Sequence, residues 1–240
     1  MTAVAVVLLH SPLTGPSAWG PLAEVLRERG HAVVVVDVTD DDDPPYAARY
    51  VARAALQVAA VAPAHPLLLV GHSGAGPLLA QVGATQRAAR RRLAGYLFLD
   101  AGLPRTRPAT RLELMETELM ETEEADFARV LHDRLHAGAR FPDWDEADLA
   151  DEVPDPEARS ALVASLRPRG HDFFTEPLPC PQDWPDAPCA YLRTSAAYDA
   201  VARVARTRGW PTYRLDLGHF AALRDPCAVA DVVARVVTDL

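Results

Sequence analysis

Short, uninterrupted runs of apolar residues recur through the first part of the chain, and the segments between them have helical spacing. The runs fall at Ala3–His10, His31–Val38, His65–Val70 and Ala94–Asp100. A continuous apolar run of this length is typical of a strand that is covered on both faces. Between the first two runs, Ala18–Arg29 repeats apolar residues at helical spacing and stops at a glycine. The alternation predicts parallel strands joined by right-handed helical crossovers.

This alternation breaks off after the fourth run and resumes near the end of the chain. The interruption contains three amphipathic helical segments, at Arg111–Thr122, Ala125–Ala137 and Pro156–Leu166. Two further strands are expected at Cys189–Thr194 and Thr212–Leu217. We therefore predict an α/β protein with a mainly parallel six-stranded sheet flanked by helices. Residues 1–102 and 184–240 form its core, and residues 103–183 form a helical cap over the ligand-binding edge of the sheet.

Composition and charge narrow the class of protein. The 240 residues suit one large domain with an insertion, and 49% hydrophobic with 24% charged residues is ordinary for a globular protein. The net charge of −9 disfavours nucleic acid and anionic membranes as partners. Cys180, Cys189 and Cys227 are widely spaced and form no ligand pattern, which predicts reduced thiols. The N-terminus has no signal-peptide features. We expect a cytoplasmic monomer or homodimer that acts on a small molecule.

A glycine-flanked serine follows the third apolar run. The stretch Gly71-His72-Ser73-Gly74-Ala75-Gly76 joins this strand to a helix that opens at Pro77. So sharp a turn leaves no room for large side chains beside Ser73, and it exposes the hydroxyl at a helix N-terminus. The spacing and position differ from the dinucleotide-binding fingerprint, which follows a first strand. The pattern predicts that Ser73 is a nucleophile.

A serine nucleophile needs a base and a carboxylate that orients the base. His219 follows the last expected strand directly, where its imidazole can reach Ser73. Asp199 is the first choice for the acid, although aspartate at that position also suits a helix N-cap. Asp100, at the end of the fourth strand, is the alternative acid.

The oxyanion formed in acyl transfer needs two hydrogen-bond donors. One is expected to be the N–H of Gly74, which follows the nucleophile. The other is expected from the loop after the first strand, which contains Ser11, Pro12 and Leu13. Proline has no N–H, so Pro12 cannot be this donor. Ser11 or Leu13 must supply it, or the second donor is missing.

Together these motifs resemble the α/β-hydrolase superfamily. Leu8-Leu9-His10, the elbow around Ser73, the mid-chain cap and Gly218-His219 carry the resemblance. Within that superfamily the chain is most similar to small capped esterases of the plant methylesterase and hydroxynitrile lyase group. The resemblance implies an α/β-hydrolase fold, Ser73 as nucleophile and His219 as base.

The chain departs from the pattern of this group at several positions. Ser11-Pro12 stands where His-Gly is usual after the first strand, and Asp199 lies about two positions after the usual acid. In the lyase branch a hydroxyl residue in the position of Ser11 contacts the substrate. Those lyases also carry a lysine after the catalytic histidine, and here it is Phe220. The resemblance therefore disfavours a cyanohydrin lyase and leaves other eliminations and cyclisations open.

The leading hypothesis is a carboxylesterase-like serine hydrolase that cleaves an ester or thioester of a small, largely apolar substrate. Leu112, Met115, Leu119 and Met120 are expected to face inward from the cap, which suits an apolar acyl group. A non-hydrolytic lyase or cyclase with the same pocket is one alternative, and a binding protein without turnover is another. We expect no cofactor and no metal, because the consecutive carboxylates of Asp40–Asp43 rarely converge on one ion.

Overall fold

The computed structural model describes residues 4–38, 42–61, 65–119, 125–181 and 183–239. Its centre is one parallel sheet with the strand order β2-β1-β3-β4-β5-β6. The strands are β1 (Ala5–Leu9), β2 (Ala32–Val36), β3 (Leu67–Ser73), β4 (Leu93–Ala101), β5 (Cys189–Arg193) and β6 (Thr212–Arg214). The six-stranded α/β fold expected from the sequence is confirmed.

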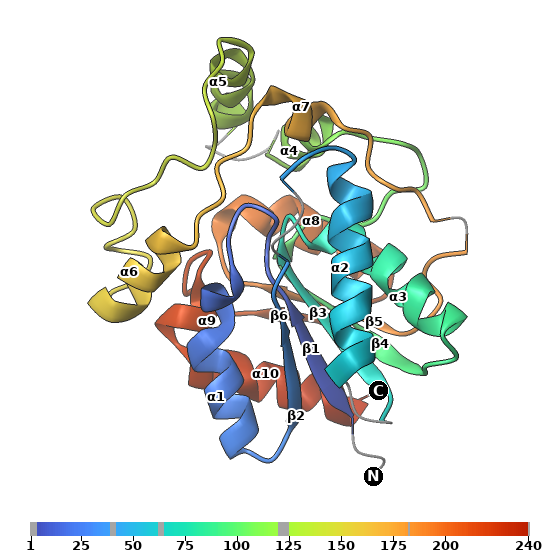
Figure 1. The fold of residues 1–240 in the computed structure, drawn as a ribbon. Helices are drawn as coiled ribbons and strands as arrows, with labels where there is room; N and C mark the ends of the chain where they lie inside the picture. The colour runs from blue at the N-terminus through green and yellow to red at the C-terminus, as the bar shows by residue number, and fades with distance from the viewer. Residues whose placement is uncertain (1–3, 39–41, 62–64, 120–124, 182, 240) are drawn as a thin grey trace.

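Helices cover both faces of this sheet (Figure 1). One face carries α2 (Tyr46–Val61), α3 (Leu79–Ala88) and α8 (Asp199–Thr207), whose apolar residues join one core cluster. The other face carries α1 (Gly20–Glu28), α9 (Ala221–Arg224) and α10 (Pro226–Asp239), which form a second cluster. Short 3₁₀ turns η1 (Pro16–Trp19), η2 (Gly76–Leu78) and η3 (Ala196–Tyr198) precede α1, α3 and α8. Two apolar layers explain why the strands read as continuous apolar runs.

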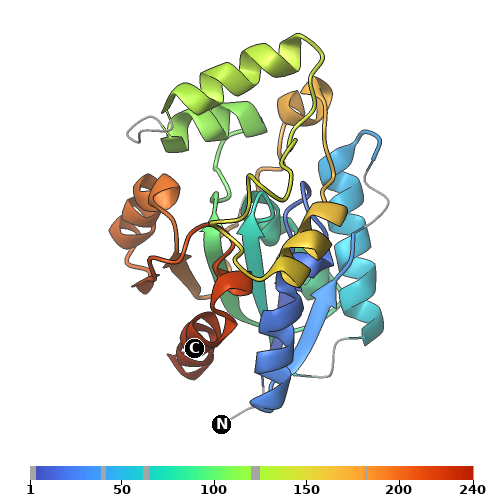
Figure 2. The ribbon, with the colours of Figure 1, turned by 90° about the vertical axis from the view of Figure 1, so that its left-hand side faces the viewer.

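Three of the four helices between β4 and β5 stand beyond one edge of the sheet, and the third along the chain lies lower, beside η1 (Figure 2). The four helices are α4 (Arg111–Leu119), α5 (Ala125–His136), α6 (Pro156–Ala164) and α7 (His171–Thr175). The sequence analysis predicted the first three and missed the short α7. Aromatic and leucine side chains of this segment form two clusters that also include core residues, Tyr46 in one and Ala18, Phe220 and Leu223 in the other. The segment lies where the cap was expected, and its limits at residues 103 and 183 stay a prediction.

The C-terminal ends of all six strands point to the cap, because the sheet is wholly parallel. Leu9 pairs with Gly71, so the loop after β1 begins beside the turn after β3. Ser73 pairs with Ala101 on the other side of β3. This register brings the loops after β1, β3 and β4 to one place beneath the cap.

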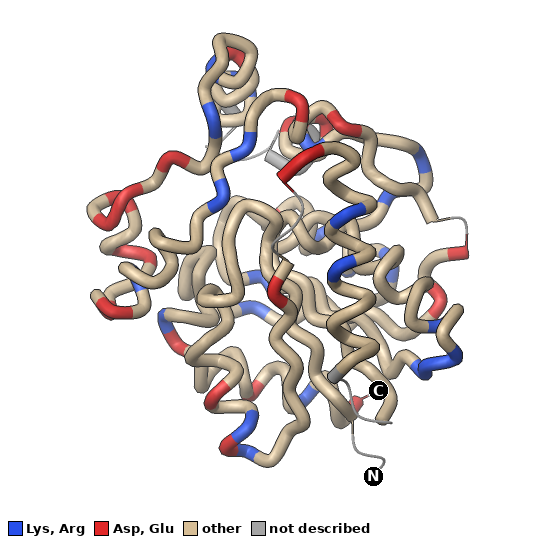
Figure 3. Tube along the Cα trace, viewed as in Figure 1, with Lys and Arg blue, Asp and Glu red and all other residues tan. Residues whose placement is uncertain are grey.

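Charged residues lie mainly on the outer helices and in the cap, and the strands are nearly free of them (Figure 3). Within the described residues, no helix is long and apolar enough to cross a membrane.

Candidate active site

Ser73 ends β3 in a backbone conformation that a serine rarely adopts. Its φ is +55°, in the left-handed region, and such strain is concentrated at functional sites. The turn closes through a hydrogen bond of 3.0 Å from Ala75 N–H to His72 O. A Cβ at Gly71 would lie 2.8 Å from the Leu79 side chain, and one at Gly76 would lie 2.1 Å from Gly102 O. The glycines are therefore required by close packing around the elbow, as the sequence predicts.

His219 lies in the loop after β6, at the same end of the sheet as Ser73. Its Nδ1 donates to Asp100 Oδ2 at 3.3 Å, and its ring stacks on Tyr198 with 5.4 Å between ring centroids. His72, in β3, supports the loop of His219, because its Nε2 donates to the His219 carbonyl at 2.9 Å. Burial, together with the neighbouring His219, holds the pKa of His72 well below its usual value, so His72 stays neutral and keeps this donor. Asp100 and Tyr198 thus hold the imidazole of His219, and the bond from His72 holds its backbone.

Asp100 is the carboxylate that contacts His219. It is completely buried near the end of β4, with a φ of +40°. Its Oδ1 accepts hydrogen bonds from Thr194 N–H at 2.6 Å and Ser195 N–H at 3.1 Å. These donors compensate the buried charge and leave Oδ2 for the imidazole.

Asp199, the first choice from the sequence, does not occupy this position. Its carboxylate pairs with Arg193 at 2.6 Å, and Arg193 also pairs with Asp216. The hydrogen bond from Arg193 lowers the pKa of Asp199. Asp199 is the first residue of α8 and is half exposed, with Tyr198 as the N-cap residue. The contact with His219 is therefore made by Asp100, the alternative acid, and not by Asp199, because Arg193 at the end of β5 engages Asp199.

Ser73 and His219 line one cavity of about 750 Å³ between the sheet edge and the cap. Among the described residues, the Ser73 hydroxyl has no hydrogen-bond partner. The association of Ser73 with His219 therefore rests on the shared cavity and not on a direct bond. In ligand-free enzymes such bonds are often long and tighten with substrate.

The loop after β1 lies against the residue that follows the nucleophile. A Cβ at Gly74 would be 3.1 Å from Ser11 Oγ and 3.4 Å from Pro12 Cδ. Within the described part of the chain, the Gly74 N–H has no acceptor and remains able to bind an oxyanion. Pro12 and Leu13 line the cavity, whereas Ser11 is buried beneath it. Leu13 N–H points to Ser11 Oγ at 3.3 Å.

His10 fixes the start of this loop. Its Nδ1 donates to Ser11 O at 2.7 Å, and its Nε2 accepts a hydrogen bond from Val38 N–H at 3.2 Å. This pattern requires the neutral ring with the proton on Nδ1. The histidine therefore ties the loops after β1 and β2 together and is not a second base.

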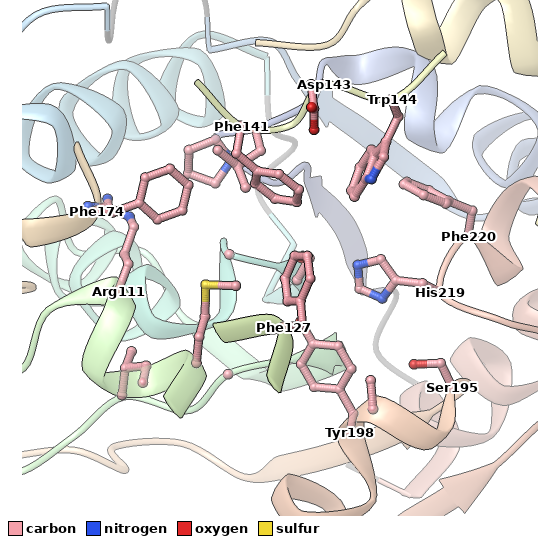
Figure 4. A pocket seen from close by; sticks show the side chains of 18 of the residues that line it. Arg111, Phe127, Phe141, Asp143, Trp144, Phe174, Ser195, Tyr198, His219 and Phe220 are labelled. Carbon is pink, nitrogen blue, oxygen red and sulfur yellow. The ribbon is translucent and has the colours of Figure 1, made fainter. Parts of the chain in front are cut away.

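The rest of the cavity wall is mainly aromatic. In Figure 4 the rings of Phe127, Phe141 and Trp144 stand around the space beside His219. Further aromatic lining comes from Phe173, Phe174, Tyr198 and Phe220. The wall suits an apolar substrate, and the sequence analysis missed these residues, although Phe141, Trp144 and the Phe173–Phe174 pair stand out in the cap sequence.

Charged and aliphatic residues occupy other parts of this wall. The ion pair of Arg134 with Asp143, at 2.5 Å, lines it, as does the buried Arg111. Met115 also lines it, and Leu112 is buried within the cap. The Leu119 side chain and Met120 lie outside the described residues.

No group of three or more metal-ligating side chains in the described residues could hold a metal ion. Asp42, from the acidic run, pairs instead with Arg167 at 2.9 Å and with Arg169 at 2.8 Å. Asp40 and Asp41 lie outside the described residues.

Comparisons with known proteins agree with this architecture. The profile of the alpha/beta hydrolase family matches residues 6–232. A solved extracellular alpha/beta-hydrolase from a Paenibacillus species, described as homologous to tobacco salicylic acid binding protein 2, aligns with a TM-score of 0.71 at 14% identity over 98% of both chains. Polyneuridine aldehyde esterase aligns with a TM-score of 0.70 at 15% identity, covering 98% of this chain and 99% of that one. Tomato methylketone synthase I aligns with a TM-score of 0.65 at 13% identity, covering 100% and 99%.

These structural likenesses, at such low identity, show the shared fold. No curated protein matches the sequence. The family profile spans nearly the whole chain, from β1 to α10, and includes both Ser73 and His219. The chain belongs to the alpha/beta hydrolase family.

Proposed function

We propose that this protein is a serine hydrolase that cleaves an ester or thioester of a small, largely apolar substrate. Membership of the alpha/beta hydrolase family supports a hydrolase in general terms. The observation that carries the finer proposal is the contact of His219 Nδ1 with the buried Asp100 carboxylate, beside a strained Ser73 that lines the same cavity. Neither a cofactor nor a metal is required for this chemistry.

In the proposed reaction, Ser73 Oγ attacks the carbonyl carbon of the substrate and forms a covalent acyl-enzyme. His219 Nε2 takes the proton from Ser73 and then gives it to the leaving alcohol or thiol. Asp100 holds the tautomer with the proton on Nδ1 and stabilises the imidazolium. The Gly74 N–H donates to the oxyanion. A water molecule, activated by His219, then releases the free acid.

The aromatic cavity supplies the apolar preference in this proposal. Burial of an apolar acyl group against Phe141, Trp144 and Phe174 contributes about 25 cal/mol for each Å² removed from water. Acyl chains that fill the cavity should therefore react faster than acetate esters.

A lyase or cyclase is the second proposal, because Pro12 removes one backbone donor from the loop that usually helps to hold an oxyanion. Methylketone synthase I shares the fold, so the fold itself does not restrict the reaction to hydrolysis.

Product analysis in water enriched in oxygen-18 separates the two proposals. Hydrolysis through an acyl-enzyme places one labelled oxygen in the free acid, and elimination or cyclisation places none. The assay should use p-nitrophenyl esters of increasing acyl length, with Ser73→Ala as the control. Turnover of these esters by Ser73→Ala at the rate of the unchanged protein would contradict the proposed nucleophile. A folded protein that turns over neither esters nor elimination substrates would favour the binding-protein alternative.

A further inference from the structure

The loop after β1 has only one backbone N–H at the cavity that could serve as an oxyanion donor. Thr14 N–H donates to Ser11 O at 3.0 Å and closes a four-residue turn with Pro12 in its second position, where proline is favoured. Of the two loop residues that line the cavity, Pro12 has no N–H and Leu13 has one. This leaves Leu13 N–H as the donor that can complement Gly74.

The Leu13 N–H is only weakly engaged. Its distance of 3.3 Å to Ser11 Oγ is longer than an ordinary N–H···O bond. Ser11 Oγ itself lies close to Gly74, because a Cβ there would approach it to 3.1 Å. The N–H therefore points toward the side of the loop that faces Gly74, and an oxyanion could take the place of the Ser11 hydroxyl.

The opposite side of the same peptide unit is held by the cap. Arg169 Nε and Nη2 both donate to the Pro12 carbonyl, each at 3.4 Å, and although each bond is long, the two converge on one oxygen and carry the guanidinium charge. The backbone N–H of Arg167 donates to Leu13 O at 2.9 Å. Two consecutive carbonyls of the loop are thus bound by one cap segment.

The side chain of Arg169 is buried and held by an ion pair and by two aromatic rings. Its side chain is 2% exposed and pairs with Asp42 at 2.8 Å. The guanidinium also lies 5.4 Å from the ring centroid of Phe173 and 5.9 Å from that of Tyr46. Its backbone pairs with Phe141, which lines the cavity. The residue connects the substrate wall, the loop after β2 and the loop after β1.

A charged donor on a carbonyl acts on the N–H at the other end of the peptide. The Pro12 carbonyl and the Leu13 N–H belong to one planar unit and point in opposite directions. Hydrogen bonds to the carbonyl fix the plane of that unit, and they polarise the N–H so that it becomes a stronger donor. Because the guanidinium carries a charge and is buried, its effect exceeds that of a neutral donor.

The loop after the first strand supplies a second oxyanion donor in this family, so the Leu13 N–H is the expected donor. We propose that Arg169 is the positioning residue that aims and polarises this N–H. This inference rests on the proposed serine hydrolase. It assigns to the cap a part in the oxyanion site, in addition to its part in the substrate wall. Arg169 touches neither substrate nor Ser73 and acts through the Pro12–Leu13 peptide.

The test is the variant Arg169→Met, assayed with p-nitrophenyl butyrate and with an alkyl fluorophosphonate, which phosphonylates serine nucleophiles. Arg91→Met is a matched control, because Arg91 also donates to backbone carbonyls, those of Val58 and Ala59 at the C-terminal end of α2, away from the segment that carries Arg169. Loss of an entire oxyanion donor lowers kcat about 100- to 1,000-fold, so a donor that remains but is loosely held should lose roughly tenfold. KM should change by less than about threefold, since the effect arises in the transition state.

An Arg169→Met protein that folds and keeps its kcat, or that loses no more activity than Arg91→Met, would overturn the proposal. If Arg169→Met does not fold, Arg169→Lys is the second variant: it keeps a charge for Asp42 but loses the pair of guanidinium donors to the Pro12 carbonyl, and an unchanged kcat would overturn the proposal. An amide-to-ester replacement of the Leu13 backbone N–H tests the donor itself with every side chain in place. It should slow fluorophosphonate labelling of Ser73 about 100-fold or more, and unchanged labelling would overturn the proposal. A different result would show that the protein is not a serine hydrolase: the unchanged protein and Ser73→Ala would react alike with the fluorophosphonate. That result would overturn both the proposed function and the role of Arg169.

Discussion

The identity of the catalytic acid can be tested by changing Asp100 and Asp199 in parallel to asparagine. In Asp100→Asn, the amide oxygen can still accept from Thr194 N–H and Ser195 N–H, which bond the carboxylate at 2.6 and 3.1 Å. The amide nitrogen would then face His219 Nδ1, where it can only donate. The imidazole must move its proton to Nε2, and it can no longer accept the proton of Ser73.

The expected loss in kcat for Asp100→Asn is about 10,000-fold, as for a triad whose histidine is held in the wrong tautomer. This corresponds to roughly 5 kcal/mol of transition-state stabilisation. Asp199→Asn removes a half-exposed partner of Arg193, which keeps its pair with Asp216. A half-exposed ion pair contributes about 0–1 kcal/mol to stability, so kcat should stay within about threefold.

The assay is the kcat for p-nitrophenyl butyrate, with the melting temperature of each variant as a control for folding. An Asp199→Asn protein that loses as much activity as Asp100→Asn would refute the assignment. So would a folded Asp100→Asn protein that keeps more than about a tenth of the kcat, since the tautomer argument requires a far larger loss.

Two further predictions concern the support of the elbow. The buried His72 has a pKa well below its ordinary value of 6.5, so the unfolded chain binds a proton that the folded chain excludes. The free energy of unfolding should therefore fall as the pH drops below about 6.5, by up to about 1.4 kcal/mol per pH unit, and an equal pH slope in urea titrations of His72→Gln would contradict this origin. Gly76→Ala forces a Cβ to within 2.1 Å of Gly102 O and should destabilise the fold by about 1–3 kcal/mol or more, whereas Gly20→Ala meets no atom within 4 Å and should be neutral or slightly stabilising; equal melting temperatures for the two variants would contradict the packing argument.

Local sequence patterns predicted the sheet and the elbow because each depends on neighbouring residues. A buried parallel strand must be apolar throughout. Neighbouring atoms approach Gly71 and Gly76 so closely that a residue with a Cβ does not fit there. His219 could be predicted in the same way, since it lies just after the expected strand Thr212–Leu217, of which the structure forms Thr212–Arg214 as β6. All three features follow from short-range rules.

The acid could not be chosen from such rules, because Asp100 and Asp199 both lie near the C-terminal ends of strands. Two sets of contacts decide between them. The Arg193 side chain forms an ion pair with Asp199, and the Thr194 and Ser195 N–H groups donate hydrogen bonds to Asp100. The contacts of Asp100 join residues 94 and 95 positions apart, and the Arg193–Asp199 pair depends on where the two side chains turn at the end of β5. No spacing in the sequence encodes them.

The cap was predicted as helices and not as a set of contacts. Arg169 stands in a segment without helical or strand periodicity, and its link to Pro12 spans 157 residues of chain. The aromatic wall around Phe141 and Trp144 also depends on how the cap folds over the sheet. The specificity of the cavity therefore becomes visible only in three dimensions.

The most direct test of the central claim is to identify the residue that an active-site serine probe phosphonylates. The purified protein should be treated with an alkyl fluorophosphonate, digested and analysed by peptide mass spectrometry. The account predicts one adduct, on Ser73, that is absent from Ser73→Ala and is strongly slowed in Asp100→Asn. An adduct on another residue, or equal labelling of the unchanged protein and Ser73→Ala, would contradict the assignment of Ser73 as the nucleophile.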